Sequence, residues 1–167
     1  MLSITELRHS DITEIAGAFA ALGWHKPAEQ YERYLQEQDA GAREIFVARW
    51  SGVFAGYVTV LWRPDYPPFA ERGVPEIQDF NVLPQFRRRH IGTVLMDVAE
   101  ARILERSPTI GIGVGLHEDY GAAQRLYVLR GYVPDGRGIT SHGRRVNWGD
   151  EARIDDDLVL WLTKSVS

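Results

Sequence analysis

Three consecutive arginines, Arg87, Arg88 and Arg89, stand directly before a segment whose apolar residues recur at helical spacing. A helix N-terminus carries partial positive charge and unpaired N–H groups, so a Ser, Thr, Asp or Asn cap is usual there and cations are unfavourable. None of these four residue types occurs between Val82 and Gly92. The pattern therefore favours an anion-binding turn, with phosphate as the common ligand at such places. A solvated basic turn is the alternative.

A second pattern places Gly111, Gly113 and Gly115 inside the apolar segment 109–116. On a strand these glycines share one face, which is then bare of side chains and lets a helix or an extended ligand approach the backbone. The segment is not a dinucleotide fingerprint, because its sixth position is Leu116 and its glycines lie within a strand pattern.

Composition limits the class of protein. With 167 residues, of which 44% are hydrophobic and 25% charged, the chain fits a single domain over 1–167. The net charge of −4 argues against a general nucleic-acid binder. The absence of cysteine excludes disulfides, thiolate metal sites and a cysteine nucleophile. We find no signal peptide, no apolar stretch long enough for a membrane span and no metal-ligand spacing among the histidines. We therefore expect a cytoplasmic protein without a metal or a membrane partner.

Periodicity and turn residues predict alternating strands and helices. The expected loops are 63–75 and 134–156, and Asp11 is expected to cap the first helix. This order indicates an α/β or α+β sheet with helices on both faces. Strands are expected at 2–8, 43–50, 53–62, 76–83, 109–116, 132–133 and 158–163, and helices at 11–22, 27–38, from the arginines to about 105, and 120–130.

Residues 76–132 resemble the acetyl-CoA-binding core of the GNAT N-acetyltransferase superfamily. The resemblance implies the GNAT fold, of α/β (α+β) class: a mixed, mostly antiparallel central sheet of about seven strands with helices on both faces, splayed between the fourth and fifth strands. The motifs that carry it are Val82-Leu83-Pro84, the run from Arg87 to Gly92, and Ala123-Gln124-Arg125-Leu126-Tyr127 before Gly131-Tyr132.

The resemblance implies acetyl-CoA as co-substrate. The loop before the helix would bind the CoA pyrophosphate through backbone N–H groups and partly through side chains, and the backbone of Phe80 and Val82 would bond the pantetheine arm and the acetyl carbonyl. His90 stands where the family prefers Gly, so this main-chain cradle requires an ordinary helical φ at His90. Tyr120 stands where many members have the Asn that bonds the pantetheine. The expected cofactor-binding residues are Phe80, Val82, Arg87, Arg88, Arg89, His90, Ile91, Gly92, Thr93 and Tyr120.

The resemblance also suggests two catalytic residues. Tyr127 occupies the position of the family's usual general acid, and a phenol with a pKa of ~10 is reasonably matched to a thiol near ~8.5. Glu76 is the candidate base, because it lies where several members carry their catalytic Glu. We expect Glu76 to share a strand face with Gln78, Phe80 and Val82.

Each catalytic assignment has a plainer alternative. Tyr127 could be an ordinary core aromatic of its helix, and Glu76 could be a surface acid at the start of a strand. Asp79, His117 and Glu118 are the fallback bases.

The sequence thus indicates an acetyl-CoA-dependent N-acetyltransferase that moves an acetyl group to a primary amine of a small molecule by direct attack in a ternary complex. A peptide or protein N-terminal or lysine acetyltransferase is one alternative, and a non-catalytic acyl-CoA-binding sensor is another. The expected partners are acetyl-CoA and an amine acceptor, with no nucleic acid, and a homodimer is left open.

Overall fold

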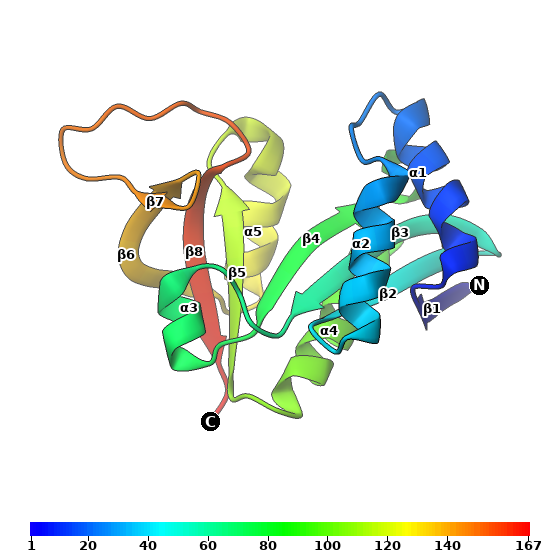
Figure 1. The fold of residues 1–167 in the computed structure, drawn as a ribbon, viewed down its shortest axis with the longest axis horizontal. Helices are drawn as coiled ribbons and strands as arrows, with labels where there is room; N and C mark the ends of the chain where they lie inside the picture. Colours follow the sequence, from blue (N-terminus) through cyan, green and yellow to red (C-terminus); the bar gives the residue numbers. More distant parts are fainter. The chain divides into compact units, whose positions relative to one another are not determined.

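A computed structural model describes all 167 residues, which form two compact units (Figure 1). Unit 1 comprises Met1–Trp62 and Ile77–Arg102, and unit 2 comprises Arg63–Glu76 and Ile103–Ser167. The expectation of a single domain over 1–167 stays a prediction. None of the helices has both the length and the apolar character needed to cross a membrane.

Unit 1 is built on four strands in the order β1-β2-β3-β4. β1 pairs with β2 and β2 with β3, both antiparallel, and the register of the second pair shifts between Ala48 and Arg49. The strands are β1 (Leu2–Glu6), β2 (Arg43–Trp50), β3 (Val53–Leu61) and β4 (Glu76–Val82), the last of which begins in unit 2. The helices are α1 (Ile12–Ala21), α2 (Ala28–Asp39) and α4 (Ile91–Leu104), with 3-10 turns η1 (His9–Asp11) and η2 (Pro84–Phe86).

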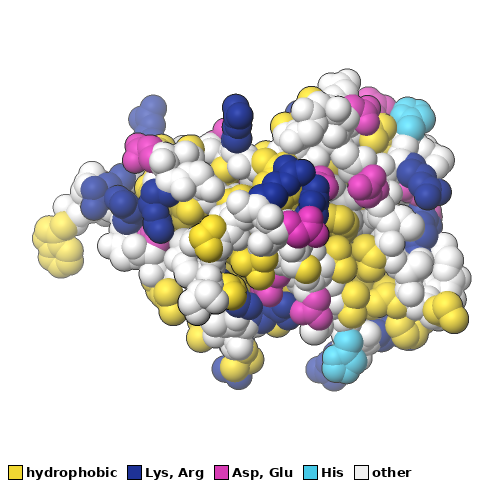
Figure 2. Space-filling model, turned by 90° about the horizontal axis from the view of Figure 1, so that it is seen from below, with side chains coloured by type: hydrophobic (Ala, Val, Ile, Leu, Met, Phe, Trp, Pro, Cys, Tyr) yellow, Lys and Arg dark blue, Asp and Glu magenta, His cyan; other side chains and the backbone are white.

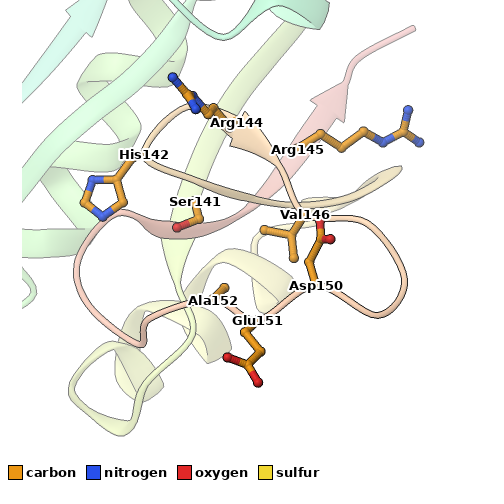
Figure 3. Close-up of a pocket in the computed structure, with 8 residues that line it drawn as sticks. All are labelled: Ser141, His142, Arg144, Arg145, Val146, Asp150, Glu151 and Ala152. Atoms are coloured by element: carbon orange, nitrogen blue, oxygen red, sulfur yellow. The ribbon is translucent and has the colours of Figure 1, made fainter.

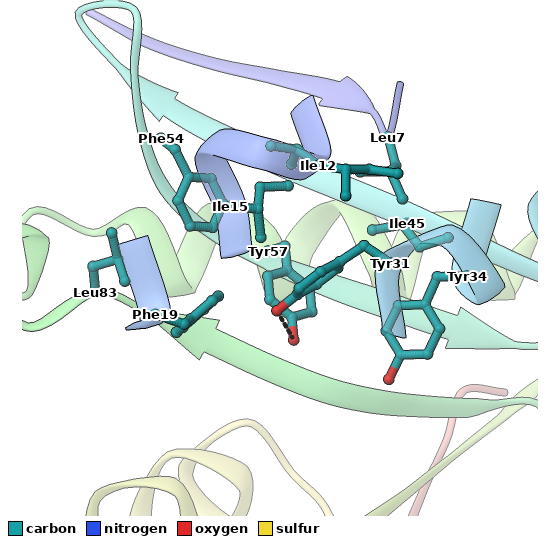
Figure 4. Close-up of a cluster of buried hydrophobic side chains, with 11 residues drawn as sticks. Leu7, Ile12, Ile15, Phe19, Tyr31, Tyr34, Ile45, Phe54, Tyr57 and Leu83 are labelled. Atoms are coloured by element: carbon teal, nitrogen blue, oxygen red, sulfur yellow. Dashed lines mark hydrogen bonds between the residues drawn. The ribbon is translucent and has the colours of Figure 1, made fainter. Parts of the chain in front are cut away.

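The core of unit 1 lies between α1, α2 and the strands (Figure 4). Phe19 of α1 is fully buried and meets the Tyr57 ring of β3 edge-on, at 5.9 Å between centroids. The Tyr31 hydroxyl from α2 bonds the Tyr57 hydroxyl at 3.3 Å. Several core side chains thus carry a polar end, which brings hydroxyl groups into an otherwise apolar layer. The cluster consists of Leu7, Ile12, Ile15, Phe19, Tyr31, Tyr34, Ile45, Val47, Phe54, Tyr57 and Leu83.

Unit 2 contains four strands in the order β5-β8-β6-β7, and all three pairs are antiparallel. The β6–β8 register shifts between Pro134 and Ile139. The strands are β5 (Thr109–Gly115), β6 (Val133–Ser141), β7 (Arg144–Arg145) and β8 (Leu158–Ser165), and the helices are α3 (Pro67–Arg72), α5 (Gly121–Leu129) and the 3-10 turn η3 (Glu118–Tyr120).

The glycine face of β5 is covered by aromatic rings of unit 2. A Cβ placed on Gly111 would collide with the Phe69 ring of α3, and one on Gly115 would collide with the Tyr120 ring. A Cβ on Gly113 would come within 2.9 Å of the ring of Trp161 on β8. The bare face expected from the sequence is thus present, but rings fill it where we expected a helix backbone or an extended ligand.

Three expectations about local structure are wrong in detail. The segment 63–75 contains helix α3, because Pro67 and Pro68 start a helix at positions where their missing N–H groups cost nothing. The strand expected at 132–133 extends to Ser141 as β6, and with β7 it brings the strand count to eight. Asp11 stands at the start of α1, but its carboxylate accepts from the Arg8 N–H and pairs with Arg49 instead of capping α1.

Candidate functional site

The turn before α4 has an unusual backbone. Arg88 and His90 both have φ near +60°, and α4 begins immediately afterwards, with its Val94 N–H bonding the His90 carbonyl at 3.0 Å. The expected helical φ at His90 is therefore wrong, and the condition stated for the main-chain cradle is not met in that form: the residue stands one place before the helix, in the left-handed region that glycine adopts most easily. Alternation of left-handed and ordinary residues can direct neighbouring N–H groups to one side, an arrangement that suits an anion.

The positive charges of this turn lie on the surface. Arg87, Arg88 and Arg89 are exposed, and none of their guanidinium groups pairs with a carboxylate. Arg87 Nε donates to the Val82 carbonyl at 3.4 Å, and the Arg89 guanidinium lies over the Trp50 ring at 5.2 Å from its centroid. Two of the three side chains are thus oriented by neighbours, and their charge is available to an anion.

Helix α4 begins close to β4. The hydrogen of Gly92 points toward the Phe80 ring, and a Cβ there would lie 3.1 Å from Phe80 Cζ and 3.6 Å from Val82 Cγ2. The structure therefore brings Phe80, Val82 and the first turn of α4 together within unit 1. This part of the expected cofactor site is contiguous.

A partly buried carboxylate, Asp79, lies in the middle of β4 with φ of +52°. Lys26 Nζ is 2.8 Å from its Oδ1, and the Tyr34 hydroxyl donates to its Oδ2 at 2.9 Å. The Lys26 ammonium also lies 5.7 Å from the centre of the Phe19 ring. Asp79 was expected only as a fallback base, and no sequence pattern indicated this network. Its donors are Lys26, Gln30, Tyr34, Tyr57 and Asn81.

The network fixes the charge state of Asp79. Burial alone would raise its pKa, but the Lys26 ammonium and the hydrogen bonds from Lys26, Tyr57 and Tyr34 hold the pKa below its ordinary value. Burial and the Asp79 charge also raise the pKa of Tyr57 well above its usual range. Asp79 is therefore an anion at neutral pH with a reduced affinity for a proton. It is better suited to holding a cation than to acting as a base.

The left-handed residue disturbs the alternation of β4. Gln78 and Asp79 are consecutive, yet Gln78 Oε1 accepts from Arg43 at 2.9 Å, and Arg43 lies over the ring of Tyr34, which bonds Asp79. Their side chains thus reach the same cluster, where a regular strand would separate them. The assumption that Glu76 shares a face with Phe80 and Val82 through strict alternation therefore fails. Glu76 itself is buried, 4% exposed, which does not match a surface acid.

Tyr127 lies in α5 of unit 2, 5% exposed, with its ring 6.0 Å from that of Tyr132. Its hydroxyl has no hydrogen-bond partner within the chain. Burial, with a smaller effect of Tyr120, raises the pKa of Tyr127 above its ordinary value. Tyr120 donates to Asp156 at 3.0 Å and packs over Gly115. Tyr127 is thus a protonated phenol at neutral pH.

Unit 2 also contains an open cavity of about 570 Å³ beside β7 (Figure 3). Basic and acidic side chains both line it. One lining residue, His142, lies 3.2 Å from Asp155 Oδ2 through its Nε2 and 3.2 Å from Asp157 Oδ2 through its Nδ1, and sequence spacing did not suggest this group of possible metal ligands. All three side chains also bond one another or the backbone at the surface, and the expectation of no metal stays a prediction. The cavity is lined by Ser141, His142, Arg144, Arg145, Val146, Asp150, Glu151 and Ala152.

Charge on the surface bears on the nucleic-acid alternative. On the face seen in Figure 2, Lys and Arg side chains are interspersed with Asp and Glu and form no continuous basic surface. The net charge of the whole chain is −4, and the expectation of no nucleic-acid partner stays a prediction.

Comparison with known proteins identifies relatives of this fold. A family model for the acetyltransferase (GNAT) family matches residues 9–132. None of the curated proteins matches the chain by sequence.

Solved structures resemble the whole chain at low sequence identity. The ribosomal-protein-S18-alanine N-acetyltransferase from Escherichia coli is 14% identical with a TM-score of 0.71, covering 100% of this chain and 95% of that one. The yncA protein from Salmonella typhimurium, solved with its cofactor acetyl-CoA, is 16% identical with a TM-score of 0.69, covering 99% and 94%. A spermidine N-acetyltransferase SpeG chimera from Vibrio cholerae and hSSAT is 15% identical with a TM-score of 0.70, covering 98% and 95%. At these identities the likeness shows the fold, and the expected fold class is confirmed.

Proposed function

Because the chain belongs to the acetyltransferase (GNAT) family, we propose that it transfers the acetyl group of acetyl-CoA to a primary amine by direct attack in a ternary complex. One observation carries the cofactor assignment. Helix α4 has no acidic residue in its first turn and follows a turn with two left-handed residues and three arginines that pair with no carboxylate. Such a turn fits a pyrophosphate, since it offers both N–H groups and positive charge.

Within this proposal the residues of unit 1 bind the cofactor. Ile91, Gly92 and Thr93 would donate backbone N–H groups to the pyrophosphate, together with His90 and the arginine turn. The backbone of Phe80 and Val82 would hold the pantetheine arm, and their closeness to Gly92 supports a continuous site. Tyr120 is proposed as a further cofactor-binding residue. Bound acetyl-CoA would supply the activated acetyl group.

Two residues are proposed to move protons. Glu76, directly or through a water, would take the proton that the amine loses, and Tyr127 would give a proton to the departing sulfur. The Tyr127 hydroxyl supports this role because it is protonated and bonded to no other group of the chain. Asp79 is a weaker candidate for the base, because its pKa is lowered and Lys26 is paired with it.

We propose a small-molecule amine as the acceptor, with a peptide or protein amine as the alternative. Proteins of this fold include one named for spermidine and one named for the alanine of a ribosomal protein, so the fold alone favours neither. A non-catalytic acyl-CoA sensor is a third candidate. A cytoplasmic location and a homodimer stay predictions.

An acceptor screen with acetyl-CoA tests the proposal. Release of free thiol would be followed over amino acids, polyamines, aminoglycosides and short peptides, with Tyr127→Phe as the matched variant. We expect release with at least one amine and a loss in the variant. If acetyl-CoA stabilised the chain against heat but no amine caused release of free thiol, the result would instead support the sensor. Absence of thermal stabilisation would contradict the cofactor assignment.

A further inference from the structure

A second, smaller cavity lies in unit 2 between the start of α3 and the β6–β7 hairpin. Its volume is about 220 Å³, sufficient for a small organic group. One wall is apolar and comes from the start of α3, and the other comes from the hairpin and carries two arginines. The cavity is lined by Tyr66, Pro67, Pro68, Arg137, Thr140, Gly143 and Arg145.

The two arginines of this cavity carry charge that the chain does not neutralise by contact. Neither Arg137 nor Arg145 forms an ion pair with a carboxylate. Asp135 is the acid bonded to this wall, and both of its oxygens are engaged: Oδ2 accepts from the Tyr66 hydroxyl at 2.6 Å and Oδ1 from the Arg137 backbone N–H at 2.9 Å. The charges of both arginines act on the Tyr66 hydroxyl and oppose the rise of its pKa that burial and Asp135 cause. The two guanidinium groups therefore converge on one region.

The walls of the cavity are held in place by packing. Tyr66 is 8% exposed, stacks on Trp161 with centroids 4.2 Å apart, and meets Phe69 edge-on at 4.8 Å. Trp161 Nε1 in turn donates to the buried Thr140 hydroxyl at 2.9 Å. A ligand would thus meet a preformed aromatic and hydroxyl surface, whereas the exposed side chains of Arg137 and Arg145 would become ordered on binding.

We propose that this cavity binds the carboxylate or phosphate of a small ligand, whose apolar body lies on Tyr66, Pro67 and Pro68. Guanidinium groups are the side chains that recognise carboxylate and phosphate by paired hydrogen bonds, and two of them reach the same cavity here. The proposal rests on unit 2 alone and does not depend on acetyl transfer.

The test measures binding of simple probes to the full chain by calorimetry. The probes are benzoate, phenyl phosphate, inorganic phosphate and the neutral benzyl alcohol. We expect benzoate or phenyl phosphate to bind more tightly than both inorganic phosphate and benzyl alcohol. Comparing the affinity of benzoate with that of phenyl phosphate distinguishes a carboxylate site from a phosphate site. Arg137→Ala and Arg145→Ala should each weaken that binding roughly tenfold or more, since each removes a charged hydrogen bond.

Arg144→Ala is the matched control. Arg144 is the exposed neighbour of Arg145 on β7, it does not line this cavity, and the two side chains leave the strand in different directions (Figure 3). We expect unchanged binding in this variant. Binding of benzyl alcohol as tight as that of benzoate, equal losses in all three variants, or no binding of any probe would overturn the proposal. If the wild-type chain bound the probes but transferred no acetyl group to any amine, that result would count against the proposed function only.

Discussion

Lys26 Nζ lies 2.8 Å from Asp79 Oδ1, an ion pair between residues 53 positions apart. Lys26 belongs to the segment between α1 and α2, and Asp79 is the left-handed residue of β4. The pair therefore ties the two N-terminal helices to the strand that also carries Phe80 and Val82. Because the Lys26 side chain is 21% exposed and that of Asp79 14%, water screens this pair only partly.

Replacing Asp79 with Asn should destabilise unit 1. Asn keeps the size of the side chain but removes the charge that Lys26 and the tyrosine hydroxyls bond, so we expect a loss of about 2–3 kcal/mol in unfolding free energy. Urea denaturation measures it. Asp119→Asn is the control, because the Asp119 side chain is 90% exposed, and its effect should stay within about 0.5 kcal/mol. Equal stability of the two variants would show that the Asp79 network contributes little.

The free energy of unfolding should depend on pH in the acid range because of Asp79. The pKa of Asp79 in the folded chain is lower than its ordinary value of 3.8, so as the pH falls the unfolded chain takes up this proton first. The stability that Asp79 contributes is thus present above about pH 4 and is lost as the pH falls through its folded pKa. Asp79→Asn should therefore give a flatter stability curve than the wild type between about pH 5 and pH 2. Parallel curves would argue against a lowered pKa.

Sequence patterns predicted the elements that obey regular periods. The apolar spacing of α1, α2, α4 and α5 and the runs of β2, β3, β5 and β8 are local properties, and these elements are present. Helix α3 was missed because Pro67 and Pro68 were interpreted as loop residues, although proline is compatible with a helix start. β6 was predicted too short because Gly136 and Gly138 are turn signals inside an irregular strand.

The candidate site was predictable only where one short segment carries it. The arginine turn is contiguous in sequence, and its lack of a cap pointed to an anion. The Asp79 network joins residues from α2, β3 and β4, and it depends on a left-handed φ that no periodicity announces. The predicted φ of His90 was wrong for a related reason, because a non-glycine residue gives no sign of a left-handed conformation. The Gly preferred by the family at this place was the available signal.

His90→Gly should leave acetyl-CoA binding intact. Glycine adopts φ of +60° at little cost, so the change should stabilise the chain by up to about 1 kcal/mol. If the backbone N–H faces the phosphate, acetyl-CoA affinity should stay within about twofold of the wild type. Calorimetry measures the affinity. His90→Ala is the matched variant, since it removes the imidazole but keeps the strained conformation. A similar loss of affinity in both variants would mean that the imidazole itself binds the cofactor.

Tyr127→Phe should lower kcat without affecting cofactor affinity. The hydroxyl bonds no other group of the chain, so folding should tolerate its removal, whereas loss of a general acid lowers kcat by about a hundredfold or more. Because burial raises the pKa of Tyr127, its phenol should cause no fall in kcat up to about pH 10. Steady-state rates across pH, with the acceptor found in the screen, provide the measurement. Tyr132→Phe, in the neighbouring ring, controls for loss of a buried hydroxyl. Wild-type kcat in Tyr127→Phe at every pH would exclude the acid role.

Trp50→Ala should weaken acetyl-CoA binding through Arg89. The Trp50 ring lies 5.2 Å from the Arg89 guanidinium and restricts its movement, and such a contact at an exposed site contributes about 0.5–1 kcal/mol. We therefore expect a two- to fivefold rise in the Kd of acetyl-CoA, roughly the equivalent of that energy. In Arg89→Ala the further change of Trp50 should have little effect, because the partner is gone. Trp148→Ala, which removes a fully exposed indole elsewhere, should leave the Kd unchanged. Additive effects of the Trp50 and Arg89 changes would show that Trp50 does not act by positioning this arginine.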